Sequence, residues 1–234
     1  MSSNPSLWVI VPAAGTGRRF AATTPKQYQP LLGKTVLEQT LDRFSRREDV
    51  AGIILVVAAE DRHLAGLSLS DKVITLPGGA ERSDSVWTAL AYLAAVADEN
   101  SYVAVHDAAR PCVRQSLLDR LFAAGVSSED GVIPALQASD TIKLVDDHRI
   151  CATLDRQLIY QAQTPQLFRF HLLYRAMLHV RKNGLSVTDD ASAVETLGIR
   201  PTVIAGDRAN LKITVADDLA LAAFYLETIL QEND

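Results

Sequence analysis

The sequence predicts an α/β fold built on an open, mostly parallel, doubly wound sheet. Apolar runs rich in β-branched residues alternate along the chain with segments of helical periodicity, and this alternation indicates βαβ units. The runs are almost continuously apolar, as expected for strands that helices cover on both faces. A glycine-rich motif directly follows the first run, at the edge where parallel sheets bind ligands.

Taken in order, the apolar runs predict strands at residues 7–13, 52–58, 72–76, 102–106 and 131–135. Helical periodicity predicts helices at residues 35–47, 83–97, 170–183 and 217–230. Thr35 and Glu38 have the spacing of a capping box at the start of the first helix. Val86, Leu90 and Leu93 form one apolar stripe on the second, as a helix packed on a sheet requires.

The alternation breaks after residue 134, where residues 141–145 and 149–154 predict a hairpin around Asp146 and Asp147. Its residues mix polar and apolar types without a clean core face. Two interpretations follow from this pattern, namely an arm that projects over about residues 138–160 and packs against another subunit, or an ordinary hairpin at the sheet edge. The chain has no internal repeat or linker, so we expect one domain over residues 1–234.

Composition excludes several functional classes. The 234 residues are 48% hydrophobic and carry a net charge of -5, which argues against a general nucleic-acid binder. Two cysteines are too few for a disulfide framework, and no Cys/His spacing indicates zinc. The sequence has neither a signal-peptide pattern nor an apolar run of the roughly 20 residues that cross a membrane. We therefore expect a cytoplasmic protein without nucleic-acid or membrane partners.

The segment Pro-Ala-Ala-Gly-Thr-Gly-Arg-Arg at residues 12–19 predicts a phosphate-binding loop. Its small residues let backbone N–H groups approach phosphate oxygens, and Arg19 and Lys26 follow where they can neutralise charge. The motif lacks the Gly-Lys-Ser/Thr ending of a Walker A loop, and Phe20 stands at the last glycine position of G-x-G-x-x-G. The alternative is a plain loop with solvated charges.

A series of sequence blocks resembles the 2-C-methyl-D-erythritol 4-phosphate cytidylyltransferases of the non-mevalonate isoprenoid pathway. The most distinctive block is Val-His-Asp-Ala-Ala-Arg-Pro at residues 105–111, and the blocks occur in order at residues 12–19, 25–28, 78–86, 105–111, 140–143, 163–166, 188–192 and 210–214. The resemblance implies a Rossmann-like nucleotidyltransferase fold. It also implies transfer of CMP from CTP to 2-C-methyl-D-erythritol 4-phosphate, which gives 4-diphosphocytidyl-2-C-methyl-D-erythritol and pyrophosphate.

Such a displacement at phosphorus concentrates negative charge, so it needs fixed cations more than a covalent nucleophile. The resemblance implies that Arg19 and Lys26 stabilise this charge, whereas Arg156 and Lys212 orient the acceptor phosphate. The residues expected to bind CTP are Ala13, Ala14, Gly15, Gly79, Ser85, Asp107 and Ala108. The residues expected to contact the acceptor are Asp107, Arg110, Thr141 and Thr188.

Asp107 ends a predicted strand, and the resemblance places it near the ribose and the metal. The alternative for Asp107 is a helix N-cap or turn acid. We expect Mg²⁺ to be held mainly by the triphosphate of CTP, because this ion uses few carboxylates, and Asp107 is the one carboxylate considered beside it. His106 is expected to be structural, since an acceptor phosphate needs no general base.

Thr141 and Arg156 lie on or beside the hairpin, so the resemblance implies a homodimer in which each arm reaches its partner's site. One departure is Ala209, where the family often has an acid. Two alternatives remain, namely a ribitol or glycerol phosphate cytidylyltransferase and a nucleotide-binding protein without turnover. The presence of Arg19, Lys26, Arg156 and Lys212 together argues against the latter, because a pure binder does not need transition-state stabilisation.

Overall fold

The computed structural model describes residues 6–15 and 24–232. The strands are β1 (Leu7–Pro12), β2 (Pro30–Leu31), β3 (Lys34–Thr35), β4 (Val50–Val57), β5 (Val73–Pro77), β6 (Tyr102–Val105), β7 (Val132–Gln137), β8 (Ile142–Asp146), β9 (Arg149–Leu154), β10 (Tyr160–Ala162), β11 (Gln166–Arg169) and β12 (Thr202–Ala205). The helices are α1 (Val36–Ser45), α2 (Arg82–Val96), α3 (Gln115–Val126), α4 (Phe170–Asn183), α5 (Asp190–Glu195) and α6 (Asp218–Glu232), with 3-10 turns η2 (Lys26–Tyr28), η3 (Leu64–Gly66) and η4 (Arg156–Leu158).

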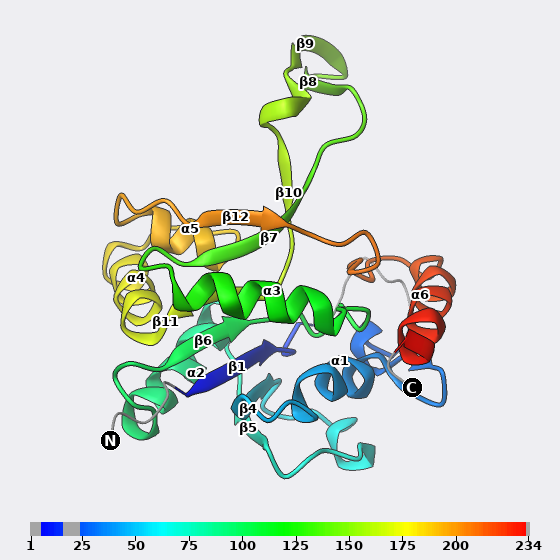
Figure 1. Ribbon diagram of the computed structural model, residues 1–234, viewed down its shortest axis with the longest axis vertical. Helices are drawn as coiled ribbons and strands as arrows, with labels where there is room; N and C mark the ends of the chain where they lie inside the picture. Colours follow the sequence, from blue (N-terminus) through cyan, green and yellow to red (C-terminus); the bar gives the residue numbers. More distant parts are fainter. Residues whose placement is uncertain (1–5, 16–23, 233–234) are drawn as a thin grey trace.

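The described strands form an eight-stranded main sheet in the order β10-β7-β11-β6-β1-β4-β5, with β12 paired to β7 (Figure 1). β1 pairs in parallel with β4 on one side and with β6 on the other. The chain therefore builds the sheet outward from β1 through β4 and β5, and then crosses to β6 on the opposite side. This reversal is a topological switch point, and the carboxyl ends of the two strands diverge there to leave a ligand crevice.

The sheet is mixed rather than wholly parallel, in agreement with the predicted fold class. β11 runs antiparallel to β6 and β7, and β10 runs antiparallel to β7. β10, β11, β12, α3 and α5 were not among the elements predicted from sequence. The other predicted strands and helices are confirmed within a few residues, and the capping box of α1 is present, with Glu38 N–H donating to Thr35 Oγ1 at 3.2 Å.

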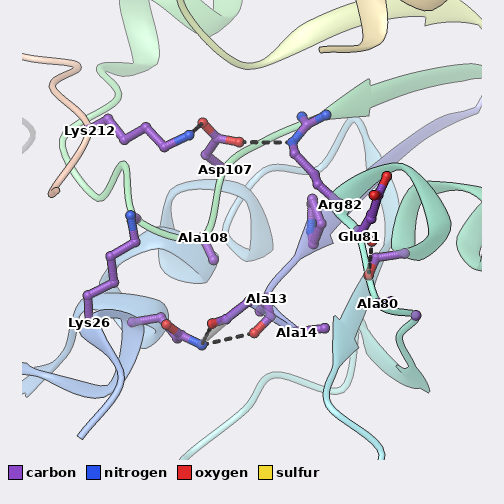
Figure 2. A pocket seen from close by; sticks show the side chains of 15 residues that line it. Ala13, Ala14, Lys26, Ala80, Glu81, Arg82, Asp107, Ala108 and Lys212 are labelled. Atoms are coloured by element: carbon purple, nitrogen blue, oxygen red, sulfur yellow. Dashed lines mark hydrogen bonds and ion pairs between the residues drawn. The ribbon is translucent and has the colours of Figure 1, made fainter. Parts of the chain in front are cut away.

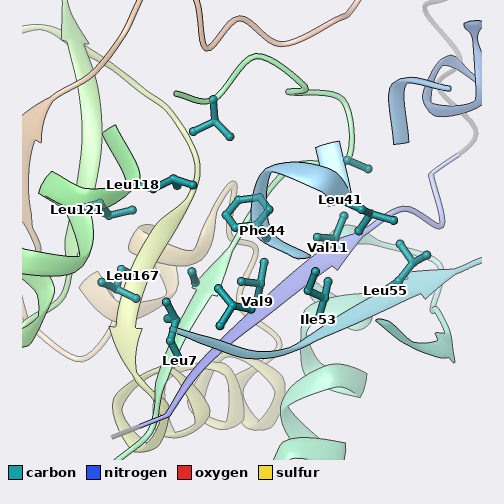
Figure 3. Close-up of a cluster of buried hydrophobic side chains, with 14 of the residues drawn as sticks. Leu7, Val9, Val11, Leu41, Phe44, Ile53, Leu55, Leu118, Leu121 and Leu167 are labelled. Carbon is teal, nitrogen blue, oxygen red and sulfur yellow. The ribbon is translucent and has the colours of Figure 1, made fainter. Parts of the chain in front are cut away.

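The helices cover both faces of the sheet and form a core on each. β1 alternates its side chains between these cores. Val9 and Val11 pack with Phe44 of α1 and with α3 on one face (Figure 3), whereas Ile10 packs with α2 and α4 on the other. Each such side chain, when fully buried, contributes about 1.5–3 kcal/mol to folding. Two packed cores thus fix β1, and with it the position of the loop that follows β1.

The hairpin of β8 and β9 projects away from the main sheet as a separate two-stranded sheet (Figure 1). β7 leads into this arm and β10 leads back from it. This geometry decides against a sheet-edge hairpin. Apolar side chains stay open to solvent on the arm, where Leu144 is 52% and Ile150 64% exposed. In the described part of the chain, no helix has the length and apolarity to span a membrane.

Candidate functional site

A cavity of about 240 Å³ lies at the switch point, between the carboxyl ends of β1 and β6 and the start of α2. Figure 2 shows Lys26 and Lys212 on one side of this cavity and Glu81 and Arg82 on the other. All seven residues predicted to bind the nucleotide line it, namely Ala13, Ala14, Gly15, Gly79, Ser85, Asp107 and Ala108. The sheet topology therefore brings together segments that lie far apart in the sequence.

The glycine-rich loop is held in place by a side chain to which the sequence analysis assigned no role. Gln27 is buried, and its Nε2 donates to Ala13 O at 2.9 Å and to Gly15 O at 3.1 Å. Ala13 N–H donates to Val56 O at 2.7 Å, as a continuation of the sheet. The Ala13 N–H is thus used within the sheet, whereas the Ala13 carbonyl oxygen has two lone pairs and can accept from a ligand in addition to Gln27. The Pro25–Tyr28 sequence block could have suggested this role for Gln27.

Two glycines permit a close approach at the floor of the cavity, where Gly79 lines the cavity and Gly78 lies behind Ala14. A Cβ atom built on Gly78 would lie 2.6 Å from Ala14 Cβ and 2.8 Å from Ser85 Oγ. One built on Gly79 would lie 2.3 Å from Asp84 Cβ. Asp84 in turn accepts a hydrogen bond from the N–H of Glu81, the N-cap residue, and so completes the capping box of α2. The two glycines are therefore required by close packing against Ala14 and against the start of α2. A plain turn would not impose this requirement.

Asp107 is the electrostatic centre of the site. Its carboxylate lies 2.9 Å from Lys212 Nζ, 3.3 Å from Arg82 Nε and 3.5 Å from Arg110 Nε. Burial alone would raise the pKa of Asp107, but the charges of Arg82, Lys212 and Arg110 hold this pKa well below its usual range. Asp107 is thus a buried, ionised acid that gathers three cations, and the helix-cap alternative is wrong because its carboxylate bonds side chains rather than a helix terminus.

A second cavity of about 250 Å³ adjoins the first. Arg82, Asp107 and Lys212 line both cavities, so these three residues mark the boundary between them. Arg110 and Thr188, both predicted to contact an acceptor, line the second cavity together with Gln163, Thr164 and Asp189. Arg110 is fixed there because its Nη1 donates to Asn210 O at 2.7 Å. The site therefore has two compartments that meet at one charged cluster.

The predicted cations are divided between the site and other parts of the chain. Lys26 and Lys212 both line the first cavity, and Lys26 Nζ donates to Ile213 O at 2.8 Å, next to Lys212. Arg19 lies outside the described residues. Arg156 is exposed on the arm and donates to Ser139 O, and Thr141 is also on the arm. Neither of these two arm residues lines the first or the second cavity.

His106 links two residues of the second cavity, Arg110 and Thr164, by hydrogen bonds. It is fully buried, its Nε2 lies 3.0 Å from Arg110 O, and its Nδ1 lies 3.1 Å from Thr164 Oγ1. A carbonyl only accepts, so Nε2 carries the proton and Nδ1 accepts from the Thr164 hydroxyl. Thr164 Oγ1 accepts in turn from Asp107 N–H at 3.0 Å. The role of His106 is thus to order the backbone around Asp107.

We expect His106 to make the protein less stable in acid. Burial lowers the pKa of His106 from 6.5 to about 4, so the unfolded chain takes up a proton at a higher pH than the folded chain. Between pH 6.5 and 4 the unfolded state binds more protons, and the free energy of unfolding falls by up to about 3 kcal/mol as pH is lowered. Urea denaturation across this range measures the fall.

His106→Asn should remove this share of the pH dependence, whereas the same change at the exposed His171 should leave it intact. An unchanged pH profile for His106→Asn would show that other groups cause the acid sensitivity.

The comparisons with known proteins agree with this geometry. The family model for 2-C-methyl-D-erythritol 4-phosphate cytidylyltransferase matches residues 7–228. The chain belongs to this cytidylyltransferase family. The enzyme of that name from Photobacterium profundum is 43% identical over 233 residues, which cover 97% of this chain and 98% of that protein. The one from Acinetobacter baumannii is 40% identical, with 97% and 96% covered.

Solved structures of the cytidylyltransferase family share the fold. The Francisella tularensis enzyme has a TM-score of 0.83 at 37% identity, with 94% of this chain and 99% of that chain covered. A 4-diphosphocytidyl-2C-methyl-D-erythritol synthase also has a TM-score of 0.83, at 36% identity, with 95% and 100% covered. These matches confirm the predicted family and its α/β nucleotidyltransferase fold.

Ala209, the departure from the family motif, has a structural explanation. It is 1% exposed and packs in the apolar cluster formed with α6. An unpaired acid is costly in such surroundings. Lys212 instead pairs with Asp107, so its position does not depend on an acid at residue 209.

Proposed function

We propose that the chain transfers CMP from CTP to 2-C-methyl-D-erythritol 4-phosphate and releases pyrophosphate, as a cytidylyltransferase of isoprenoid precursor synthesis. The observation that carries this proposal is the pair of adjoining cavities that share Arg82, Asp107 and Lys212. A nucleotide in the first and a phosphorylated polyol in the second would meet at this cluster. The bond between the two phosphates would then form where the positive charge is concentrated.

The reaction needs positioned charge rather than a covalent nucleophile. An oxygen of the acceptor phosphate attacks the α-phosphorus of CTP, and the bond to the β-phosphate breaks as pyrophosphate leaves. Lys26 would offset charge on the nucleotide phosphates, and we retain the same role for Arg19. Arg110 and Lys212 would hold the acceptor phosphate, which is already ionised and needs no general base. His106 remains a structural residue.

Mg²⁺ is proposed as the metal, with CTP supplying most of its ligands. Among residues 6–15 and 24–232, no cluster of three or more His, Cys, Asp or Glu side chains could hold a metal ion. Asp107 offers one carboxylate beside the nucleotide cavity, which suits an ion bound by substrate phosphates and one or two carboxylates. When bound, the ion would neutralise charge on the phosphates. Chelation by EDTA should therefore stop turnover, and added Mg²⁺ should restore it.

Base recognition is proposed at the Ala13–Ala14 backbone and at Gly79, beside the buried Ser85. Gly78→Ala should raise the KM for CTP about tenfold with little change in kcat, because overpacking of this floor costs about 1–3 kcal/mol. The new methyl group would push Ala14 into the cavity. Steady-state kinetics with varied CTP measures the effect.

Gly66→Ala is a matched control for Gly78→Ala. A Cβ on Gly66 meets nothing within 4 Å, so we expect wild-type kinetics. An unchanged KM for a well-folded Gly78→Ala variant would argue against base binding at this floor.

The active form is proposed to be a homodimer with composite sites. Thr141 and Arg156 lie on the projecting arm, away from both cavities of their own chain. The arm also exposes apolar side chains such as Leu158, which is 78% exposed. Such an apolar surface is typical of a contact with another subunit, and a symmetric exchange of arms would place each Arg156 near its partner's acceptor cavity.

The direct test is magnesium-dependent release of pyrophosphate from CTP, with methylerythritol 4-phosphate and ribitol 5-phosphate offered separately as acceptors. Release with the first acceptor alone supports the proposed function. Release with ribitol 5-phosphate alone would keep the mechanism and change the acceptor. CTP binding without release would favour a nucleotide-binding protein that has no turnover.

A further inference from the structure

Arg82, which is partly buried, forms an ion pair with the fully buried Asp190 behind the cluster around Asp107. Arg82 Nη2 lies 2.7 Å from Asp190 Oδ2, and the Asp190 side chain is 1% exposed. The other oxygen, Asp190 Oδ1, is buried and has no hydrogen-bond partner in the described part of the chain. The cost of burying Asp190 is thus offset mainly by Arg82.

Asp190 is held in place by the start of α5. Asp189 caps this helix by accepting from Ser192 N–H. Gln166 of β11 fixes the same turn, because its Nε2 donates to Asp189 Oδ2 at 2.7 Å and its Oε1 accepts from Ala191 N–H at 2.9 Å. The sheet therefore sets where the Asp190 carboxylate lies, and this carboxylate sets where the guanidinium of Arg82 can lie.

Arg82 is fixed between two acids and still faces both cavities. Its Nε donates to Asp107 Oδ1 and its Nη2 to Asp190 Oδ2, while Nη1 makes no hydrogen bond with the residues that the structure describes. Burial lowers the pKa of Arg82, but the two carboxylates outweigh this effect and raise it, so Arg82 is charged. A planar guanidinium held on one edge presents its remaining donors in a fixed direction.

A purely stabilising role is a weak explanation for this pair. Burying two charges costs about as much as their attraction returns, and apolar replacements of similar size are often equally stable. Arg82 instead stands at the boundary of the two cavities, where negative charge accumulates during the proposed reaction, and Asp190 lies behind it.

We propose that Arg82 is a further cation of the reaction centre, binding phosphate oxygens at the boundary of the two cavities, and that Asp190 is the positioning residue that holds it there. This inference rests on the proposed function and adds two residues to it. Asp190 acts through Arg82, so the effects of changing the two residues should not be additive.

The experiment compares Arg82→Met, Asp190→Asn and the double variant with the unmodified enzyme, by kcat/KM for both substrates and by Tm. Arg82→Met leaves the buried carboxylate of Asp190 unpaired, and Asp190→Asn leaves Arg82 with Asp107 alone. Both single changes should therefore lower Tm, whereas the double change removes both charges and should recover Tm. Arg82→Met and the double variant should both lose about a hundredfold or more in kcat/KM. Asp190→Asn should raise the KM for the acceptor, and Arg82→Lys should recover part of the loss.

The double variant tests the proposal even if one of the single variants does not fold. A stable double variant with kcat/KM within about threefold of the unmodified enzyme would overturn the proposal and leave the pair as structural. So would a further loss when Asp190→Asn is added to Arg82→Met. Arg47→Met is the control, because Arg47 pairs with Asp49 and Asp119 away from both cavities and should change Tm alone. An unmodified enzyme without turnover would instead count against the proposed function itself.

Discussion

Replacing Lys26 by alanine is expected to lower kcat by about a hundredfold or more while CTP still binds. Lys26 lines the nucleotide cavity, and its Nζ donates to Ile213 O beside Lys212. In the proposed reaction its charge would lie beside the phosphates of CTP, so its contribution should grow as the bond to pyrophosphate breaks. Single-turnover rates together with calorimetric CTP affinities measure the two effects separately.

Lys26→Arg, which keeps the charge, should retain more activity than Lys26→Ala. The matched control is Lys34→Ala, because Lys34 is an exposed lysine that pairs with Asp42 away from the cavity. The proposed role of Lys26 fails if Lys26→Ala loses CTP affinity in full and keeps its kcat.

Arg156→Ala is expected to reduce activity about as strongly as Lys26→Ala, although Arg156 lies outside both cavities of its own chain. The reason is the proposed exchange of arms, which places this guanidinium against the acceptor phosphate of the partner subunit. Mixing Arg156→Ala with Lys26→Ala subunits and allowing them to exchange should restore about a quarter of the wild-type rate. Each mixed dimer would then contain one site with both residues intact.

Lys143→Ala provides a control on the same arm, because Lys143 is exposed and donates to Thr153 within the hairpin. It should leave the rate unchanged. Exchanged dimers that recover no activity, or an active Arg156→Ala variant, would contradict a composite site.

The sequence was most informative where side-chain pattern and local structure agree. The strands that became β1, β4, β6 and β7 were predicted because both of their faces are covered, which makes the runs continuously apolar. β5 was predicted from a similar apolar run, although it is a partly exposed edge strand. β10, β11 and β12 are three or four residues long, too short to show a period. α3 has an apolar stripe of Leu117, Leu118 and Leu121, so its periodicity could have been recognised.

The residues of the site also divide into those that a local sequence pattern predicts and those that depend on distant contacts. Ala13, Gly79 and Asp107 were predicted because they sit at strand ends or in glycine turns, and Lys26 and Lys212 because they sit in the family's motifs. Gln27 and Arg82 were within quoted motifs but had no assigned role, because their partners are the carbonyl of Ala13 and the carboxylates of Asp107 and Asp190. Nothing in sequence spacing indicates contacts between residues 82 and 190.

By itself the sequence determined the fold class, the family and most of the residues that line the first cavity, because these depend on local period and on motifs. Only the tertiary structure decided that Arg82, Asp107 and Lys212 form one boundary between two cavities, and that the hairpin leaves the main sheet. The physical reason is the switch point between β1 and β6. Strand order sets which loops converge there, and strand order is decided by long-range packing of the two cores rather than by any local pattern.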